Sequence, residues 1–190
     1  MQKLREEMET FFGALYEDDK KVLVHGEGFL HARAALVGEA PGEQETLQRK
    51  PFVGKAGKNL DAFLAASGLR REDLYITNTV KFRPTRLSAA GRIVNRPPTQ
   101  EEIRLFLPWL KRELHFVNPT CVVTLGNVPL NALADQKTTI GEVHGSFLHT
   151  EDGLLLYPMY HPASLIYNPS LREVYAEDIN HLSKWLAGNN

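Results

Sequence analysis

The sequence has almost no cysteine, since Cys121 is the single one among 190 residues. One thiol cannot form a disulfide within the chain, and it cannot supply a zinc or iron–sulfur site built from cysteines alone. Cys121 lies in the apolar run CVVTLG, which favours a buried strand residue over a nucleophile. The cysteine content therefore excludes a disulfide scaffold and an all-cysteine metal site.

Long apolar runs are also missing. No uninterrupted apolar segment approaches the roughly 20 residues of a membrane-spanning helix, and the first residues lack the basic, apolar and small-residue order of a secretory signal. We expect a soluble, cytoplasmic protein with no membrane partner. A length of 190 residues, 43% of them apolar, predicts one domain over residues 1–190, and we expect a monomer without an obligate protein partner.

The chain has little net charge, but its charges are unevenly placed. The formal net charge is -1, whereas residues 49–96 hold eleven Lys or Arg and three Asp or Glu, a local charge of +8. A basic segment of this kind is typical of a surface that faces phosphates, and it is equally compatible with an ordinary solvated face.

Short apolar runs alternate with helical patterns along the chain. The apolar runs predict buried strands at 34–38, 75–80, 121–126 and 154–159. Apolar spacing predicts helices at 2–19, 56–67, 99–116 and 171–186, and a short helix after Gly126. This alternation favours an α/β fold in which crossover helices join parallel strands.

Two further segments have recognisable turn chemistry. Asp152-Gly153 lies between two apolar runs and predicts a hairpin. Residues 83–99 contain three prolines and four arginines, and we expect them to form a long loop.

Polar residues follow the predicted strands. GEAPGEQE (38–45) follows the first strand, Asn78 lies at the end of the second, and His161 follows the fourth. Because ligands of open parallel sheets bind at the carboxyl ends of the strands, we expect a site for a polar, planar ligand there.

Each of these residues also has a purely structural interpretation. Gly38, Pro41 and Gly42 are typical of a tight turn that a ligand can approach, but such residues also occur in ordinary loops. The carboxylates of Glu39, Glu43 and Glu45 can complement a helix start. Phe52 is either a core residue or a stacking surface. His161 precedes Pro162, which holds an imidazole rigidly, although a lone histidine is more often structural. The histidine spacing predicts no metal site.

Four linked motifs carry a family resemblance. GEAPGEQE with RKPFVGKAG, then YITNTVKFRP, and finally YHPASLIYNPS resemble the family 4 type uracil-DNA glycosylases, over about residues 25–170. The resemblance implies a three-layer α/β/α domain with a central four-stranded parallel sheet. It also implies a base excision repair enzyme that binds uracil-containing DNA, flips the base out of the helix and hydrolyses its N-glycosidic bond without metal.

The resemblance assigns a role to individual positions. Phe52 is implied to stack on uracil, Asn78 to read its polar edge, and Glu45 to lie beside C5, where a thymine methyl group would clash. His161 is implied to donate a hydrogen bond to the uracil oxygen that becomes negative.

Further positions follow from the same motifs. The backbone of Ala40, Pro41 and Gly42 is implied to line the pocket, and Glu39 to hold the attacking water. Leu165, Ile166 and Tyr167 resemble a loop that wedges into the duplex. The same three residues are also compatible with a simple turn before the last helix.

The sequence departs from the family pattern at the residues that bind the cofactor. Typical family 4 members hold a four-iron, four-sulfur cluster with four cysteines, and the corresponding positions here are Phe11, Ala14, Phe82 and Leu105. We expect a branch without the cluster, in which apolar packing replaces it. Tyr167 is a second departure, because a basic residue is expected there.

Two other functions remain open. The chain is compatible with a glycosylase for another deaminated base, such as hypoxanthine. It is also compatible with a non-catalytic module that binds nucleic acid or nucleotides in the same pocket.

Overall fold

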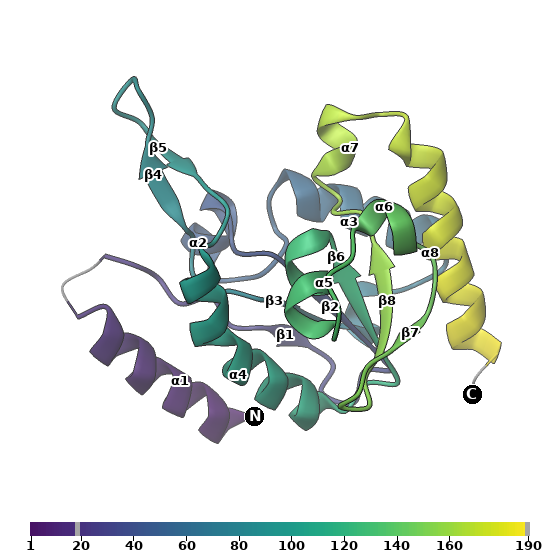
Figure 1. Ribbon diagram of the computed structural model, residues 1–190, viewed down its shortest axis with the longest axis horizontal. Coiled ribbons are helices and arrows are strands. Elements are labelled where there is room, and N and C mark those ends of the chain that lie inside the picture. The colour runs from purple at the N-terminus through teal and green to yellow at the C-terminus, as the bar shows by residue number, and fades with distance from the viewer. Residues whose placement is uncertain (18–19, 189–190) are drawn as a thin grey trace.

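The computed structural model describes residues 1–17 and 20–188, and a six-stranded sheet lies at its centre (Figure 1). The strand order is β1-β3-β2-β6-β8-β7. Four parallel strands form the middle of the sheet: β2 (Ala34–Gly38), β3 (Tyr75–Asn78), β6 (Cys121–Leu125) and β8 (Leu155–Met159). The short strands β1 (Glu27–Gly28) and β7 (Leu148–His149) pair antiparallel at the two edges. The predicted parallel sheet is thus confirmed.

Helices cover both faces of the sheet. Their bounds are α1 (Gln2–Leu15), α2 (Glu43–Gln48), α3 (Lys55–Ala66), α4 (Gln100–Val117), α5 (Asn127–Leu133), α6 (Ile140–Val143), α7 (Ser164–Tyr167) and α8 (Leu171–Gly188), and a 3₁₀ turn spans Arg71–Asp73. One core joins the strands to α3 and α8, and a second joins them to α4 and α5. This is the expected three-layer α/β/α architecture.

The predicted helices are found with shifted ends. The first helix ends at Leu15 instead of continuing to 19, and residues 18 and 19 of that prediction lie outside the described residues. The helix predicted from TQEE begins as expected, since Thr99 Oγ1 accepts a 3.1 Å bond from the Glu102 N–H and Glu102 Oε2 accepts a 2.7 Å bond from the Thr99 N–H. None of the described helices is long and apolar enough to cross a membrane.

The 83–99 segment differs from the prediction. Instead of a loop it forms an antiparallel hairpin of β4 (Thr85–Leu87) and β5 (Ile93–Asn95), which projects from the body (Figure 1). Its prolines lie outside the two strands, so they remove no ladder hydrogen bond. The predicted turn at Asp152-Gly153 is confirmed and connects β7 to β8.

Strand register brings the sequence motifs to one edge of the sheet. Gly38 at the end of β2 pairs with Asn78 at the end of β3. The loops after these strands are tied together, because Gly38 O accepts bonds from the Thr79 N–H at 2.8 Å and from the Thr79 hydroxyl at 2.9 Å. The fold therefore holds GEAPGEQE, at the end of β2, beside YITNTVKFRP, which contains β3.

Candidate active site

A cleft of about 440 Å³ opens at the carboxyl ends of the parallel strands. Eight of its lining residues were predicted as site residues: Ala40, Gly42, Glu45, Phe52, Asn78, His161, Ile166 and Tyr167. Three predicted residues do not line it: Glu39, Pro41 and Leu165. The motifs at the beginning, middle and end of the chain thus meet in one cavity.

Gly38 makes room for two side chains of the cleft. A Cβ atom at this position would lie 2.5 Å from Asn78 Oδ1 and 2.5 Å from Phe52 Cζ. Asn78 is buried, with 3% of its surface exposed, and Phe52 has 5% exposed. A glycine at the end of β2 is therefore what lets an amide and an aromatic ring pack together beneath the cleft.

The backbone of Phe52 is held in an unusual conformation. Its φ of 53° lies in the left-handed region, which costs a bulky residue about 1–3 kcal/mol. Arg71 compensates by donating to the Phe52 carbonyl at 3.1 Å and to the Pro51 carbonyl at 2.7 Å, while Asp61 pairs with the same guanidinium at 2.8 Å. Sequence reasoning missed Arg71, whose two carbonyl bonds hold the backbone of Pro51 and Phe52 in place.

Glu45 organises the loop around the cleft. Its Oε1 accepts from the N–H groups of Val53 at 2.9 Å and Gly54 at 2.6 Å, and its Oε2 accepts from the Gly42 N–H at 3.1 Å. Glu45 lies in the first turn of α2, as the helix-start interpretation expected. The carboxylate therefore has a structural function in addition to its position in the cleft wall.

His161 presents one defined tautomer. Its Nδ1 accepts a 3.1 Å bond from the Ala163 N–H, so the proton of the neutral ring lies on Nε2. Burial lowers the pKa of His161 to about 4, and the nearby Glu45 carboxylate opposes this only in part. The ring lies 5.8 Å from that of Phe52, centroid to centroid. The cleft thus contains a neutral N–H donor at physiological pH.

Glu39 follows β2 directly. Its backbone carbonyl accepts a 3.0 Å bond from the Val80 N–H. Burial raises the pKa of its carboxyl group, although this group does not line the cleft itself. Pro41, which was also expected to line the pocket, is buried and does not line the cleft.

Only two of the three residues predicted to wedge into the duplex are exposed. Leu165 is 1% exposed and belongs to the core that α3 and α8 share, so it cannot enter a duplex without leaving that core. Ile166 and Tyr167 are 44% and 87% exposed at the rim of the cleft. The side-chain directions of α7 therefore correct the assignment of Leu165.

Three of the four expected cluster positions belong to an aromatic core. Phe82 is buried there with Phe12 and Phe106, and Phe11 and Leu105 pack against the same group. Ala14 is exposed and takes no part, which corrects the expectation that all four positions fill one space. A four-thiolate cluster does not fit this chain, whose one cysteine, Cys121, is buried in β6.

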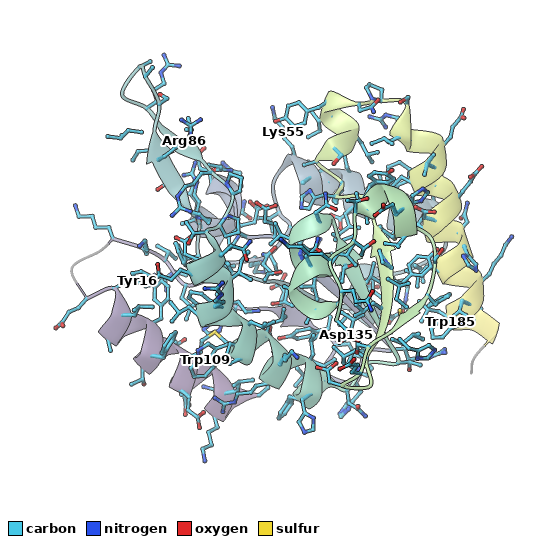
Figure 2. The ribbon with its side chains drawn as sticks, viewed as in Figure 1. Tyr16, Lys55, Arg86, Trp109, Asp135 and Trp185 are labelled. Atoms are coloured by element: carbon cyan, nitrogen blue, oxygen red, sulfur yellow. The ribbon has the colours of Figure 1, made fainter. Side chains whose placement is uncertain are left out.

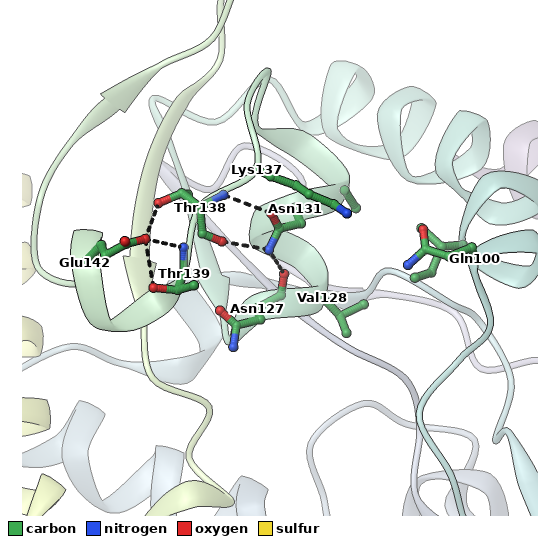
Figure 3. Close-up of a pocket in the computed structure, with 10 residues that line it drawn as sticks. Gln100, Asn127, Val128, Asn131, Lys137, Thr138, Thr139 and Glu142 are labelled. Carbon is green, nitrogen blue, oxygen red and sulfur yellow. Dashed lines mark hydrogen bonds between the residues drawn. The ribbon is translucent and has the colours of Figure 1, made fainter.

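A second groove, of about 590 Å³, lies beside α5 and α6 (Figure 3). Its polar side chains are largely occupied with one another. Asn131 exchanges bonds of 3.0 and 3.1 Å with the Thr138 backbone, and Glu142 accepts a 2.9 Å bond from the Thr139 N–H. This groove is larger than the cleft, but its contacts stabilise the segment between α5 and α6, and among the described residues its lining includes neither a histidine nor an aromatic ring.

Sequence reasoning also missed Asn95 and Lys55, which line the cleft. Asn95 belongs to the hairpin that was expected to be a loop, and no strand pattern in the sequence indicated its position. Lys55 was visible only as part of the basic segment 49–96.

Comparisons with known proteins agree with this geometry. The model of the uracil DNA glycosylase superfamily matches residues 25–184. The type-4 uracil-DNA glycosylase of Saccharolobus solfataricus is 38% identical over 88% of this chain and 78% of its own length, and that of Archaeoglobus fulgidus is 39% identical over 85% and 80%. The crystal structure of SMUG2 from Pedobacter heparinus shares the fold, with a TM-score of 0.58 and 13% identity over 100% of this chain and 86% of that one. The chain therefore belongs to the uracil-DNA glycosylase superfamily.

Proposed function

We propose that the protein is a monofunctional uracil-DNA glycosylase, which hydrolyses the N-glycosidic bond of uracil in DNA during base excision repair. The observation that carries the proposal is the meeting of Phe52, Asn78 and His161 in one cleft. A flipped base needs a stacking surface, a partner for its polar edge and a donor for its developing charge. These three residues supply one of each.

Recognition is assigned to Phe52 and Asn78. The Phe52 ring stacks on the uracil plane, and its clamped backbone keeps the ring in place before DNA arrives. The Asn78 amide accepts from uracil N3–H and donates to O4. Glu45 lies beside C5, held by its three backbone N–H bonds, and excludes a thymine methyl group.

Bond cleavage is assigned to His161 and Glu39. As the glycosidic bond breaks, uracil leaves as an anion, and the Nε2–H of neutral His161 donates to its O2. Removing a fixed donor of this kind typically costs about 100- to 1000-fold in rate. The water that attacks C1′ of the sugar is assigned to Glu39, which directly precedes Ala40 of the cleft wall and whose own carboxyl group lies outside the lining of the cleft.

The proposed enzyme has three further features: its contact with the duplex, the replacement of the cluster, and its action as a cytoplasmic monomer. Ile166 and Tyr167 occupy the space that the extruded base leaves in the duplex. The aromatic core around Phe82 replaces the iron–sulfur cluster of relatives, which is supported by the packing of Phe11 and Leu105 against it. The cleft is complete within one chain, which supports action as a monomer, and we place that action in the cytoplasm.

Asn78→Asp tests the recognition step. Aspartate keeps the acceptor for N3–H but loses the donor to O4, and it suits the exocyclic amine of cytosine instead. We expect slower excision of uracil and new excision of cytosine, measured on end-labelled oligonucleotides that carry uracil, cytosine or hypoxanthine. An unchanged base preference would remove Asn78 from this role, and wild-type excision of hypoxanthine alone would identify a different lesion.

A further inference from the structure

Asn95 of the β4–β5 hairpin lines the cleft, yet the proposed chemistry does not use this hairpin, which projects from the body of the molecule (Figure 1). Leu87 and Ile93 pair directly across its two strands and are 69% and 64% exposed. A two-stranded hairpin has little stability of its own, and directly opposed residues of an antiparallel pair lie on the same face. The hairpin therefore presents an uncovered apolar surface.

The base of the hairpin is fastened to the cleft. Asn95 at the end of β5 lines the cleft, and its Oδ1 accepts a 2.7 Å bond from Arg83 Nε. Arg83 also donates to Glu43 of α2 at 3.3 Å. These bonds fix the hairpin relative to the cleft rim.

Two of the four arginines in this segment are neutralised within the protein. Arg83 pairs with Glu43, and Arg96 pairs with Glu102 at 2.6 Å. Arg86 and Arg92 are exposed, and neither forms an ion pair with a residue that the structure describes.

The register separates charge from apolar surface. Arg86 lies opposite Val94. Arg92 directly precedes β5, and its carbonyl accepts a 2.8 Å bond from the Ser88 N–H, which continues the pairing and places Arg92, two residues before Val94, on the same face. Leu87 and Ile93 occupy the other face. Figure 2 shows Arg86 on the hairpin and, apart from it, Lys55 at the start of α3, which lines the cleft.

We propose that the β4–β5 hairpin is a DNA-binding arm that holds the duplex beside the flipped nucleotide. Arg86 and Arg92 bind phosphates, and the Leu87–Ile93 pair packs on deoxyribose surface in the groove. The inference rests on the proposed function, which supplies the DNA. Exposed cations on one face and an apolar pair on the other suit an arm that lies in a groove, whose walls present both phosphates and sugars, whereas an ordinary solvated hairpin needs no exposed Leu87 and Ile93.

Salt-dependent binding separates the two faces. The probe is a fluorescent duplex with one tetrahydrofuran abasic analogue, which has no base to excise, and anisotropy gives the binding constant at several salt concentrations. Three double variants are compared with the wild type: R86A/R92A, L87S/I93S and the control K3A/K184A, whose lysines lie on α1 and near the end of α8. Thermal unfolding checks that each variant is folded.

Each face has its own expected signature. Loss of two phosphate contacts lowers the slope of log binding constant against log salt by about 2. L87S/I93S weakens binding at every salt concentration with the slope unchanged, and K3A/K184A matches the wild type.

The outcomes distinguish failure of the DNA-binding arm from failure of the proposed glycosylase function. If the wild type excises uracil and binds the probe, but R86A/R92A keeps the wild-type slope, the arm is refuted. If L87S/I93S binds like the wild type, the sugar contact is refuted. Failure of the wild type to excise any uracil would refute the proposed function instead.

Discussion

Replacing Gly38 by alanine adds one methyl group where β2 meets the two recognition side chains. The new Cβ would lie 2.5 Å from both Asn78 Oδ1 and Phe52 Cζ. Ordinary contacts begin near 3.5 Å, so the amide and the ring must each retreat by about 1 Å. Both belong to buried surroundings, which offer little free space for that movement.

The expected loss of activity follows from this displacement. Misplacing groups by about 1 Å typically costs about 100-fold in rate, which corresponds to about 2.7 kcal/mol of transition-state stabilisation. Overpacking also lowers the free energy of unfolding by about 1–3 kcal/mol. The assay is single-turnover uracil excision from an end-labelled oligonucleotide, with the unfolding free energy measured in urea.

Gly13→Ala is the matched control. Gly13 lies in α1, and a Cβ atom there would meet nothing within 4 Å. Alanine inside a helix is more stable than glycine by about 0.5–1 kcal/mol, so this variant should gain stability and keep its excision rate. A Gly38→Ala enzyme that excises uracil as fast as Gly13→Ala would refute the assignment of Asn78 and Phe52 to the base pocket.

Two further predictions concern buried ionisable groups. The His161 imidazole should titrate near pH 4 by nuclear magnetic resonance, because burial lowers its pKa to about 4. Since the unfolded chain binds this proton more tightly, stability should fall as pH drops from about 6.5 toward 4; a titration at the ordinary value would contradict the burial argument. Lys81 and Glu113 form a buried ion pair, with Nζ and Oε2 2.5 Å apart, and Tyr75 and Thr77 complete the hydrogen bonding of the carboxylate. Glu113→Gln leaves the lysine charge unpaired and should lower the unfolding free energy by about 3–5 kcal/mol, while Lys81→Met with Glu113→Leu should cost less; equal losses in chemical denaturation would show that the unpaired charge is not the cause.

The fold could be predicted from the sequence because short sequence patterns mark most of its strands and helices. The four parallel strands are short, largely apolar runs, and Thr99 with Glu102 marks a helix start in the sequence itself. The β4–β5 hairpin was missed because its strands have three residues each and are defined by their mutual pairing. A composition rich in proline and arginine gave the opposite expectation.

The site residues were predicted mainly from the family resemblance of the linked motifs and less from the physical properties of single residues. Phe52 illustrates the limit, because the sequence offered a choice between a core residue and a stacking surface. The structure shows a ring that belongs to the core and also lines the cleft. Leu165 and Tyr167 are two positions apart, yet one is buried and the other exposed, which a continuous apolar run does not reveal.

The most direct test of the central claim is an excision assay with the wild type and His161→Ala. End-labelled oligonucleotides carrying one uracil or one thymine are incubated without added metal, and alkali then cleaves any abasic site. We predict cleavage at uracil alone, with His161→Ala slower by at least about 100-fold. A His161→Ala rate within about twofold of the wild type would contradict the leaving-group role, and intact uracil after incubation with the wild type would contradict the proposed function.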